Sequence, residues 1–166
     1  ETAECWAIAL AEQDRPSLLA LTRQNLPPLR HDVTENLCLK GGYRLRSASA
    51  GRKVVLVATG SEVSLAMDIA DRMEVAGQGA DVVSMVSTEL FDEQSPAYQA
   101  DILPDDALLV SIEAGTTFGW ERYTGRDGLR FGIDSFGASA PIEDLFKHFG
   151  LTVDAITPQI LARIGA

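Results

Sequence analysis

Apolar positions along the chain fall into short blocks that predict strands separated by helices. Four apolar runs bounded by turn residues have the length and composition of buried strands, namely 53–59, 81–87, 107–113 and 129–134. Helical spacing occurs at 61–77 and 141–150, and shorter helical or turn stretches occupy 95–103 and 118–125. Strands that alternate with helices form mostly parallel sheets covered on both faces. We therefore predict an α/β fold for this part of the chain.

The first forty or so residues follow a different pattern. A helix is expected from residue 1 to Arg15 and Pro16, because proline disfavours helical backbone in the residue before it. The apolar run 17–22 predicts a strand, but one strand cannot form a sheet without partners. Prolines and glycines among polar residues over 26–42 indicate a linker between domains. This incomplete unit and the missing initiator Met predict a fragment of a longer protein.

Capping residues support the predicted helix boundaries. Thr59 or Ser61 can cap the helix at 61–77, with Glu62 completing a capping box, and Gly77 can end that helix in the left-handed conformation. Near the C-terminus, Thr157 is the expected cap of a last helix.

Composition and charge narrow the possible partners. The 166 residues are 46% hydrophobic and 23% charged, as in globular proteins with a sizeable core. A net charge of −10 repels nucleic acid and anionic lipid, and no apolar run approaches the ~18 residues of a membrane span. We therefore expect no nucleic acid and no membrane as partner. Cys5 and Cys38 lack the spacing of metal ligands, so reduced thiols of a cytoplasmic protein and no metal site are expected.

A cation and two amides follow the predicted strand at 17–22. Arg23, Gln24 and Asn25 lead directly into a turn that contains Pro27. A guanidinium beside apolar residues is costly to bury without a partner. Arg23 therefore either pairs with a carboxylate of the chain or binds an anionic ligand through two parallel hydrogen bonds. The residues alone leave both roles open, and the two amides are expected to support the turn.

Two other turns carry candidate chemistry. Gly60 and Ser61 lie between a predicted strand and a helix, where backbone N–H groups can hold a phosphate. The full spacing of a nucleotide-binding loop is absent, so a capped turn is the simpler interpretation. Glu113 ends another predicted strand, where it can be an acid, a base, an effector contact, a buried ion pair or a subunit contact. Ser139 and His148 lack the context of a nucleophile and its base, so no residue is predicted to be catalytic.

Several motifs occur in the order in which transketolases carry them. They are RQNLP (23–27), GGY (41–43), ATGSEVSLA (58–66), VVSMVSTELFDEQSPAYQADILP (82–104), IEAG (112–115) and FGASAP (136–141). Together they span nearly the whole chain, which resembles the C-terminal portion of transketolase. Val86 and the segment 116–128 depart from the usual family wording, which puts in doubt the contacts of the last domain but not the family.

The resemblance implies a particular architecture. Residues 37–166 would form the transketolase C-terminal domain, a three-layer sandwich with a mostly parallel, mixed five-stranded sheet. Residues 1–36 would be the tail of the preceding pyrimidine-binding domain and a linker, a helix–strand remnant of another α/β domain.

The resemblance also implies an activity. Transketolases transfer a two-carbon ketol unit between ketose and aldose sugar phosphates, as homodimers that use thiamine diphosphate and a divalent metal, Mg or Ca. Arg23 matches the family arginine that binds the substrate phosphate, and the last domain chiefly supports the dimer. The cofactor and metal ligands would precede residue 1, so this fragment is expected to hold no cofactor and to be inactive alone.

Two alternatives remain at this level. The chain could be a non-catalytic regulatory or interaction module that binds an anion at the turns near Gly60 and Glu113. It could also be the C-terminal part of a 2-keto-acid dehydrogenase or of deoxyxylulose-phosphate synthase. The RQNLP motif argues against a keto acid, because that substrate has no distal phosphate for Arg23 to bind.

Overall fold

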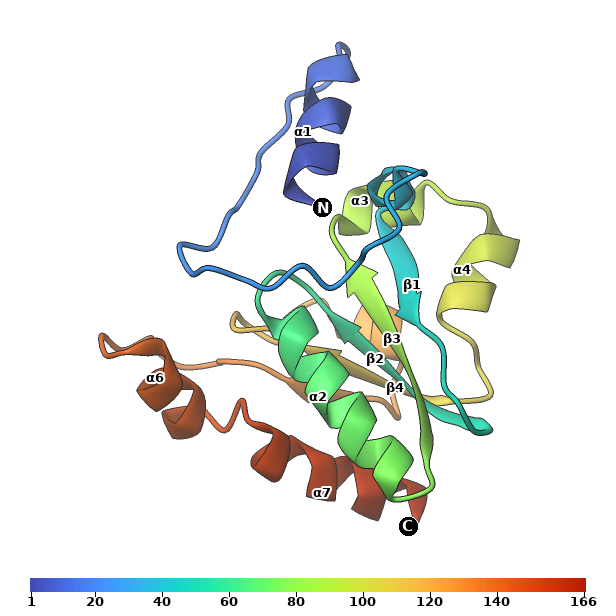
Figure 1. The fold of residues 1–166 in the computed structure, drawn as a ribbon, viewed down its shortest axis with the longest axis vertical. Coiled ribbons are helices and arrows are strands. Elements are labelled where there is room, and N and C mark those ends of the chain that lie inside the picture. The colour runs from blue at the N-terminus through green and yellow to red at the C-terminus, as the bar shows by residue number, and fades with distance from the viewer.

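The centre of the sheet is strand β2 (Arg52–Ala58), whose residues from Val54 onward are apolar and buried on both faces. A computed structural model describes all of residues 1–166 (Figure 1). The five strands lie in the order β1-β3-β2-β4-β5. The other four are β1 (Gly42–Arg46), β3 (Gly79–Met85), β4 (Leu108–Ile112) and β5 (Leu129–Phe131). Strands β2 to β5 pair in parallel and only β1 is antiparallel, so the predicted mixed, mostly parallel sheet is confirmed.

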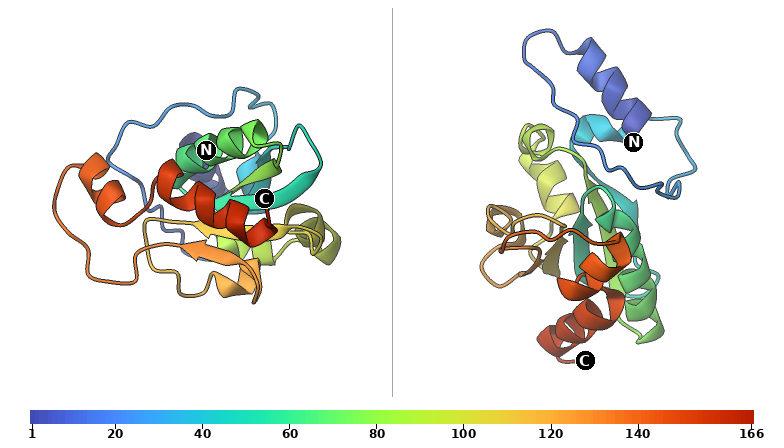
Figure 2. Two further views of the ribbon diagram at one scale, coloured as in Figure 1. Left: turned by 90° about the horizontal axis from the view of Figure 1, so that it is seen from below. Right: turned by 90° about the vertical axis from the view of Figure 1, so that its left-hand side faces the viewer.

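Helices cover both faces of this sheet, as the alternating pattern predicted. One face packs against α2 (Glu62–Val75) and α7 (Val153–Ile164), which lie side by side (Figure 2). The shorter helices on the other face are α3 (Thr88–Asp92), α4 (Pro96–Ile102) and α5 (Glu121–Thr124). A further helix, α6 (Ile142–His148), precedes α7. The two faces bury separate apolar clusters, which makes the fold a three-layer sandwich.

The residues before β1 form an arm at one end of the sheet. Its helix α1 (Thr2–Ala11) ends four residues before Arg15, and a 3-10 turn, η1 (Leu37–Lys40), leads into β1. The strand predicted at 17–22 is wrong for this chain: these residues pair with no strand, and Leu18 is 94% exposed. A strand requires hydrogen-bonded neighbours, and none of the five strands pairs with this segment.

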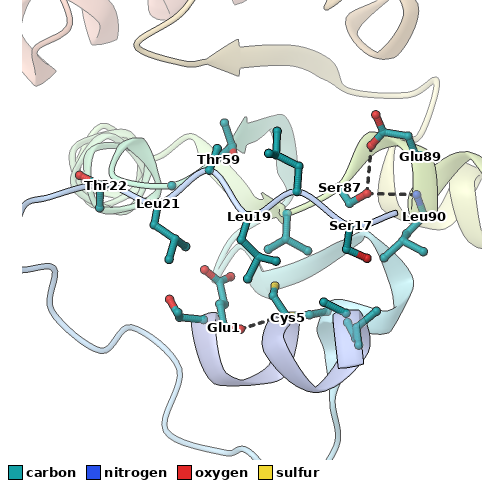
Figure 3. Close-up of a pocket in the computed structure, with 18 of the residues that line it drawn as sticks. Glu1, Cys5, Ser17, Leu19, Leu21, Thr22, Thr59, Ser87, Glu89 and Leu90 are labelled. Atoms are coloured by element: carbon teal, nitrogen blue, oxygen red, sulfur yellow. Dashed lines mark hydrogen bonds between the residues drawn. The ribbon is translucent and has the colours of Figure 1, made fainter. Parts of the chain in front are cut away.

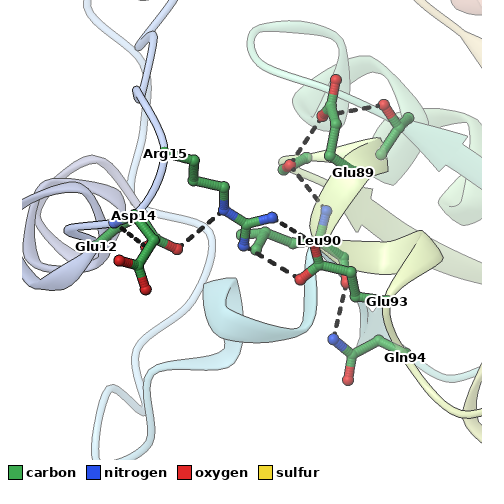
Figure 4. Close-up of polar contacts among 9 residues, drawn as sticks. Glu12, Asp14, Arg15, Glu89, Leu90, Glu93 and Gln94 are labelled. Carbon is green, nitrogen blue, oxygen red and sulfur yellow. Dashed lines mark hydrogen bonds and ion pairs between the residues drawn. The ribbon is translucent and has the colours of Figure 1, made fainter.

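Ion pairs fix the arm to the sheet domain. The Arg15 guanidinium binds Glu12 at its Nε and the carboxylate of Glu93, which follows α3, through both terminal nitrogens (Figure 4). Closer to β1, Arg30 pairs with Glu4 of α1. Since Arg15 joins positions far apart in sequence, its contacts hold the arm in place where no sheet pairing does.

Two predicted caps are wrong. Ser61 is the N-cap residue of α2 but makes no capping hydrogen bond, because its backbone is helical (φ −67°, ψ −27°) where a capping residue is usually extended, and its hydroxyl donates to Glu62. Helix α7 starts earlier than expected, and Thr152 caps it by accepting the backbone N–H of Ala155. Thr157, the predicted cap, therefore lies buried inside the helix. The end of α2 is as predicted, since Gly77 is left-handed with φ 73°.

None of the helices combines the length and apolar character that crossing a membrane requires.

Candidate functional site

A cleft of about 870 Å³ lies between the arm and the sheet domain (Figure 3). The domain side includes Thr59 and Gly60 after β2 and Ser87 after β3, at the carboxyl ends of two parallel strands. Gln24 and Asn25 line it from the arm. Open α/β sheets bind ligands at this edge. The fold thus brings three of the sequence-predicted site residues, Gln24, Asn25 and Gly60, to one cleft.

Arg23 stands at the edge of this arrangement. It is exposed and makes no hydrogen bond or ion pair with any residue of the chain, and it is absent from the walls of the cleft that its two neighbours line. Of the two roles open from the residues alone, the internal ion pair is therefore not formed. The guanidinium is free to bind an anion from outside this chain.

The turn at Gly60 faces a carboxylate. Glu62, at the start of α2, is only 4% exposed, and burial raises the pKa of its carboxyl. Its Oε1 accepts the Ser61 hydroxyl at 2.7 Å, and a Cβ added at Gly60 would lie 3.9 Å from its Oε2. Gly60 itself has φ 56°, which a side chain would disfavour. An anion bound at this turn would have to approach the Glu62 carboxylate, and Ser61 does not line the cleft.

Glu113 lies after β4 and is half-buried. Its carboxylate accepts the indole N–H of Trp120 and makes no ion pair with any cation of the chain. It does not line the cleft. The contact joins the loop after β4 to the buried Trp120 side chain.

The structure also joins two residues that the sequence left apart. Cys5 of α1 and Cys38 of η1 both line the cleft, and the neighbouring Cys38 side chain lowers the pKa of Cys5 to about 7. No spacing motif relates residues so distant in sequence, so no sequence signal could have found this pair.

The donor set does not fit a metal ion. Within residues 1–166, no three His, Cys, Asp or Glu side chains are grouped so that they could hold one. The residues described here therefore provide no site for the metal that accompanies thiamine diphosphate.

Comparisons with known proteins agree on one family. The family model of the transketolase-like C-terminal domain matches residues 41–152. The transketolase of Sinorhizobium medicae is 47% identical over 97% of this chain, and the chloroplastic transketolase of Solanum tuberosum is 44% identical over 94%. The chain spans only 23% and 21% of those relatives.

A solved structure agrees with the sequence relatives. Transketolase from Pichia stipitis in complex with sedoheptulose-7-phosphate superimposes with a TM-score of 0.88 and 36% identity, over 99% of this chain and 24% of its own. That coverage includes the arm as well as the sheet domain. The chain therefore belongs to the transketolase family, and it corresponds to the portion of the family that contains the C-terminal domain.

Proposed function

We propose that this chain is part of a transketolase that transfers two-carbon ketol units between sugar phosphates, and that Arg23 binds the substrate phosphate. The observation that carries the proposal is an exposed guanidinium without any internal partner, next to a cleft at the carboxyl ends of the parallel strands. The planar fork of arginine matches the oxygens of a phosphate ester, and two parallel hydrogen bonds fix its orientation.

The negative net charge of the chain increases the need for a cation such as Arg23 at the binding site. A net charge of −10 repels sugar phosphates from most of the surface, so a local cation must offset that repulsion. Transketolase of Pichia stipitis has been solved with xylulose-5-phosphate, fructose-6-phosphate and sedoheptulose-7-phosphate, which supports sugar phosphates as the substrate class here. Gln24 and Asn25 would support Arg23 by fixing the turn beside the cleft.

The rest of the parent enzyme would supply the chemistry. We assign residues 1–36 to the tail of the pyrimidine-binding domain and its linker, and residues 37–166 to the C-terminal domain. The exposed, unpaired segment 17–22 supports this division, because an apolar strand sequence without neighbours fits a sheet completed by other residues. Thiamine diphosphate and its Mg or Ca would bind elsewhere in the parent protein, since no metal-binding group occurs here.

Three further points of the proposal concern the assembly. The parent enzyme is proposed to be a homodimer that the C-terminal domain helps to stabilise. The present chain is proposed to be inactive by itself, and any ketol transfer by the purified 166 residues would contradict this. A cytoplasmic location stays a prediction, because chloroplastic enzymes are among the relatives.

The role of Arg23 is tested by kinetics of the full-length enzyme. Arg23→Ala should raise KM for sugar phosphates roughly tenfold or more, because a charge-assisted hydrogen bond contributes about 1.5–3 kcal/mol. Arg23→Lys keeps the charge but loses the fork, so it should fall between Arg23→Ala and the wild type.

The matched control is Arg126→Ala, which removes another exposed and unpaired arginine, from the turn before β5. It should leave KM unchanged. Equal KM values for the wild type and Arg23→Ala, or equal increases in both alanine variants, would contradict a specific phosphate contact.

A further inference from the structure

Cys5 and Cys38 lie in separate elements that only the tertiary structure brings together. Cys5 belongs to α1 in the arm, and Cys38 belongs to η1, which leads into the sheet domain. Both line the same cleft, and Figure 3 shows the Cys5 side chain there. A bond between them would close the whole intervening segment into a loop, and that segment carries Arg23.

The contacts around the two sulfurs fix their proximity. The Glu1 carbonyl oxygen accepts the backbone N–H of Cys5 at 2.8 Å and lies 4.0 Å from Cys38 Sγ. Cys38 Sγ is also 3.5 Å from Glu4 Oε2, one residue before Cys5. The Cys38 thiol therefore sits against the first turn of α1, beside Cys5.

The environments of the two thiols differ in a way that assigns them different roles. Cys5 is partly exposed, and the neighbouring Cys38 side chain lowers its pKa to about 7. Cys38 is 0% exposed, and the neighbouring Cys5 side chain together with burial raises its pKa. Cys5 is therefore the more accessible and more acidic thiol, and Cys38 is the buried thiol that keeps its proton. An accessible thiolate beside a buried thiol is the arrangement of an attacking and a resolving cysteine.

A shared metal does not explain the pair. Two thiols and nearby carboxylates could suggest zinc, but no three His, Cys, Asp or Glu side chains in the chain are arranged to hold an ion. Thiol–disulfide chemistry between the two sulfurs is therefore the function that we consider for this pair.

We propose that Cys5 and Cys38 form a redox-active dithiol that a small-molecule disulfide, such as oxidised glutathione, converts into an intramolecular disulfide. The Cys5 thiolate attacks one sulfur of the oxidant and releases one thiol, leaving a mixed disulfide on Cys5. Cys38 then loses its proton and attacks the Cys5 sulfur, which releases the second thiol with that proton. Two protein thiols are oxidised and one disulfide is reduced to two thiols, so atoms and electrons balance.

The bond would join α1 directly to the entrance of β1. Residues 6–37, with Arg23 among them, would then be held at both ends by covalent structure, which lowers the conformational freedom of the loop. Arg15 already pairs with Glu93, and Arg30 pairs with Glu4. The disulfide would therefore hold in place an arrangement that these ion pairs already form.

The test uses the full-length protein under native conditions. The wild type is incubated with oxidised glutathione, quenched in acid, blocked with N-ethylmaleimide and mapped by mass spectrometry of non-reduced peptides. A linked Cys5–Cys38 peptide should form and disappear on treatment with dithiothreitol. Cys38→Ser should stop at glutathionylated Cys5, because the resolving thiol is missing. Cys5→Ser should leave Cys38 unmodified, because that thiol is buried.

A second measurement separates the proposed roles from simple proximity. In the reduced wild type, iodoacetamide should alkylate Cys5 at least about tenfold faster than Cys38. Three outcomes would overturn the proposal: no linked peptide in the oxidised wild type, wild-type protein that stops with glutathione on Cys5, or Cys38 that alkylates as fast as Cys5.

Discussion

Asp81 joins three neighbouring strands, so replacing it should destabilise the sheet more than any exposed carboxylate would. It lies on β3 with its side chain 6% exposed, between Arg44 of β1 and Arg52 of β2. Its Oδ2 is 2.9 Å from Arg44 Nε and 3.8 Å from Arg52 Nη1. Its Oδ1 accepts the backbone N–H of Ala48 at 2.8 Å. Asp81→Ala removes all three interactions at once.

The magnitude follows from what each partner keeps. Removing one member of a fully buried ion pair costs about 3–5 kcal/mol. Arg44 and Arg52 are 24% and 28% exposed, and each retains a second carboxylate, Asp101 and Asp106 respectively. Solvent and the second carboxylates screen the two arginines, which lowers the cost of losing Asp81. The Ala48 N–H, left without its acceptor, adds to that cost. We expect Asp81→Ala to lower the free energy of unfolding by about 2–3 kcal/mol, and Asp81→Asn by about half as much because its oxygen still accepts the Ala48 N–H.

Urea unfolding of the 166-residue chain, followed by circular dichroism, measures this effect. With a slope of about 1–3 kcal/mol per molar urea, the midpoint should fall by about 0.7 to 3 M. Asp101→Ala and Asp106→Ala are the matched controls, because they remove the exposed partners of the same two arginines. Each control should cost less than about 1 kcal/mol.

Two results would refute the reasoning. If Asp81→Ala stays within about 0.5 kcal/mol of the wild type, the buried carboxylate does not hold the three strands. If Asp101→Ala costs as much as Asp81→Ala, burial of Asp81 is not what makes its interactions strong.

The remaining predictions concern a buried carboxyl and the last helix. Burial raises the pKa of Glu62, so the folded chain binds its proton more tightly than the unfolded chain and stability falls as pH rises through that raised pKa. The stability gain of Glu62→Gln over the wild type should therefore grow between about pH 4 and pH 7 in urea titrations, and a constant difference would contradict it. Thr152→Ala should cost about 1 kcal/mol by removing the α7 cap. Thr157→Val, which removes a buried hydroxyl without a hydrogen-bond partner, should cost nothing, and urea unfolding measures both variants.

Elements buried on both faces could be predicted from the sequence because burial imposes a local pattern. Strand β2 is a continuous apolar run bounded by turn residues, so its position follows from composition alone. The edge strand β1 carries the charged residues Arg44 and Arg46, so its sequence predicts no strand, and its first residue, Gly42, falls in the predicted linker. Only the structure explains these charges, because Arg44 pairs with Asp81 of β3 and Arg46 pairs with Asp71 of α2.

The strand predicted at 17–22 was wrong because its structure depends on partners outside the segment. Its apolar residues have strand propensity, but strand structure depends on hydrogen bonds to neighbours that this chain does not supply. In the candidate site, the sequence placed the cation at Arg23 but left its partner open. The structure decided that no internal carboxylate reaches it.

The sequence by itself determined the α/β class, the buried strands and the family, because each depends on residue types at fixed local spacing. Only the tertiary structure decided which side chains meet across long separations: Cys5 with Cys38, Arg15 with Glu93, and Arg23 with no residue of the chain. The physical reason is that such contacts depend on how the chain closes in space, and one sequence carries no distance between residues far apart along it.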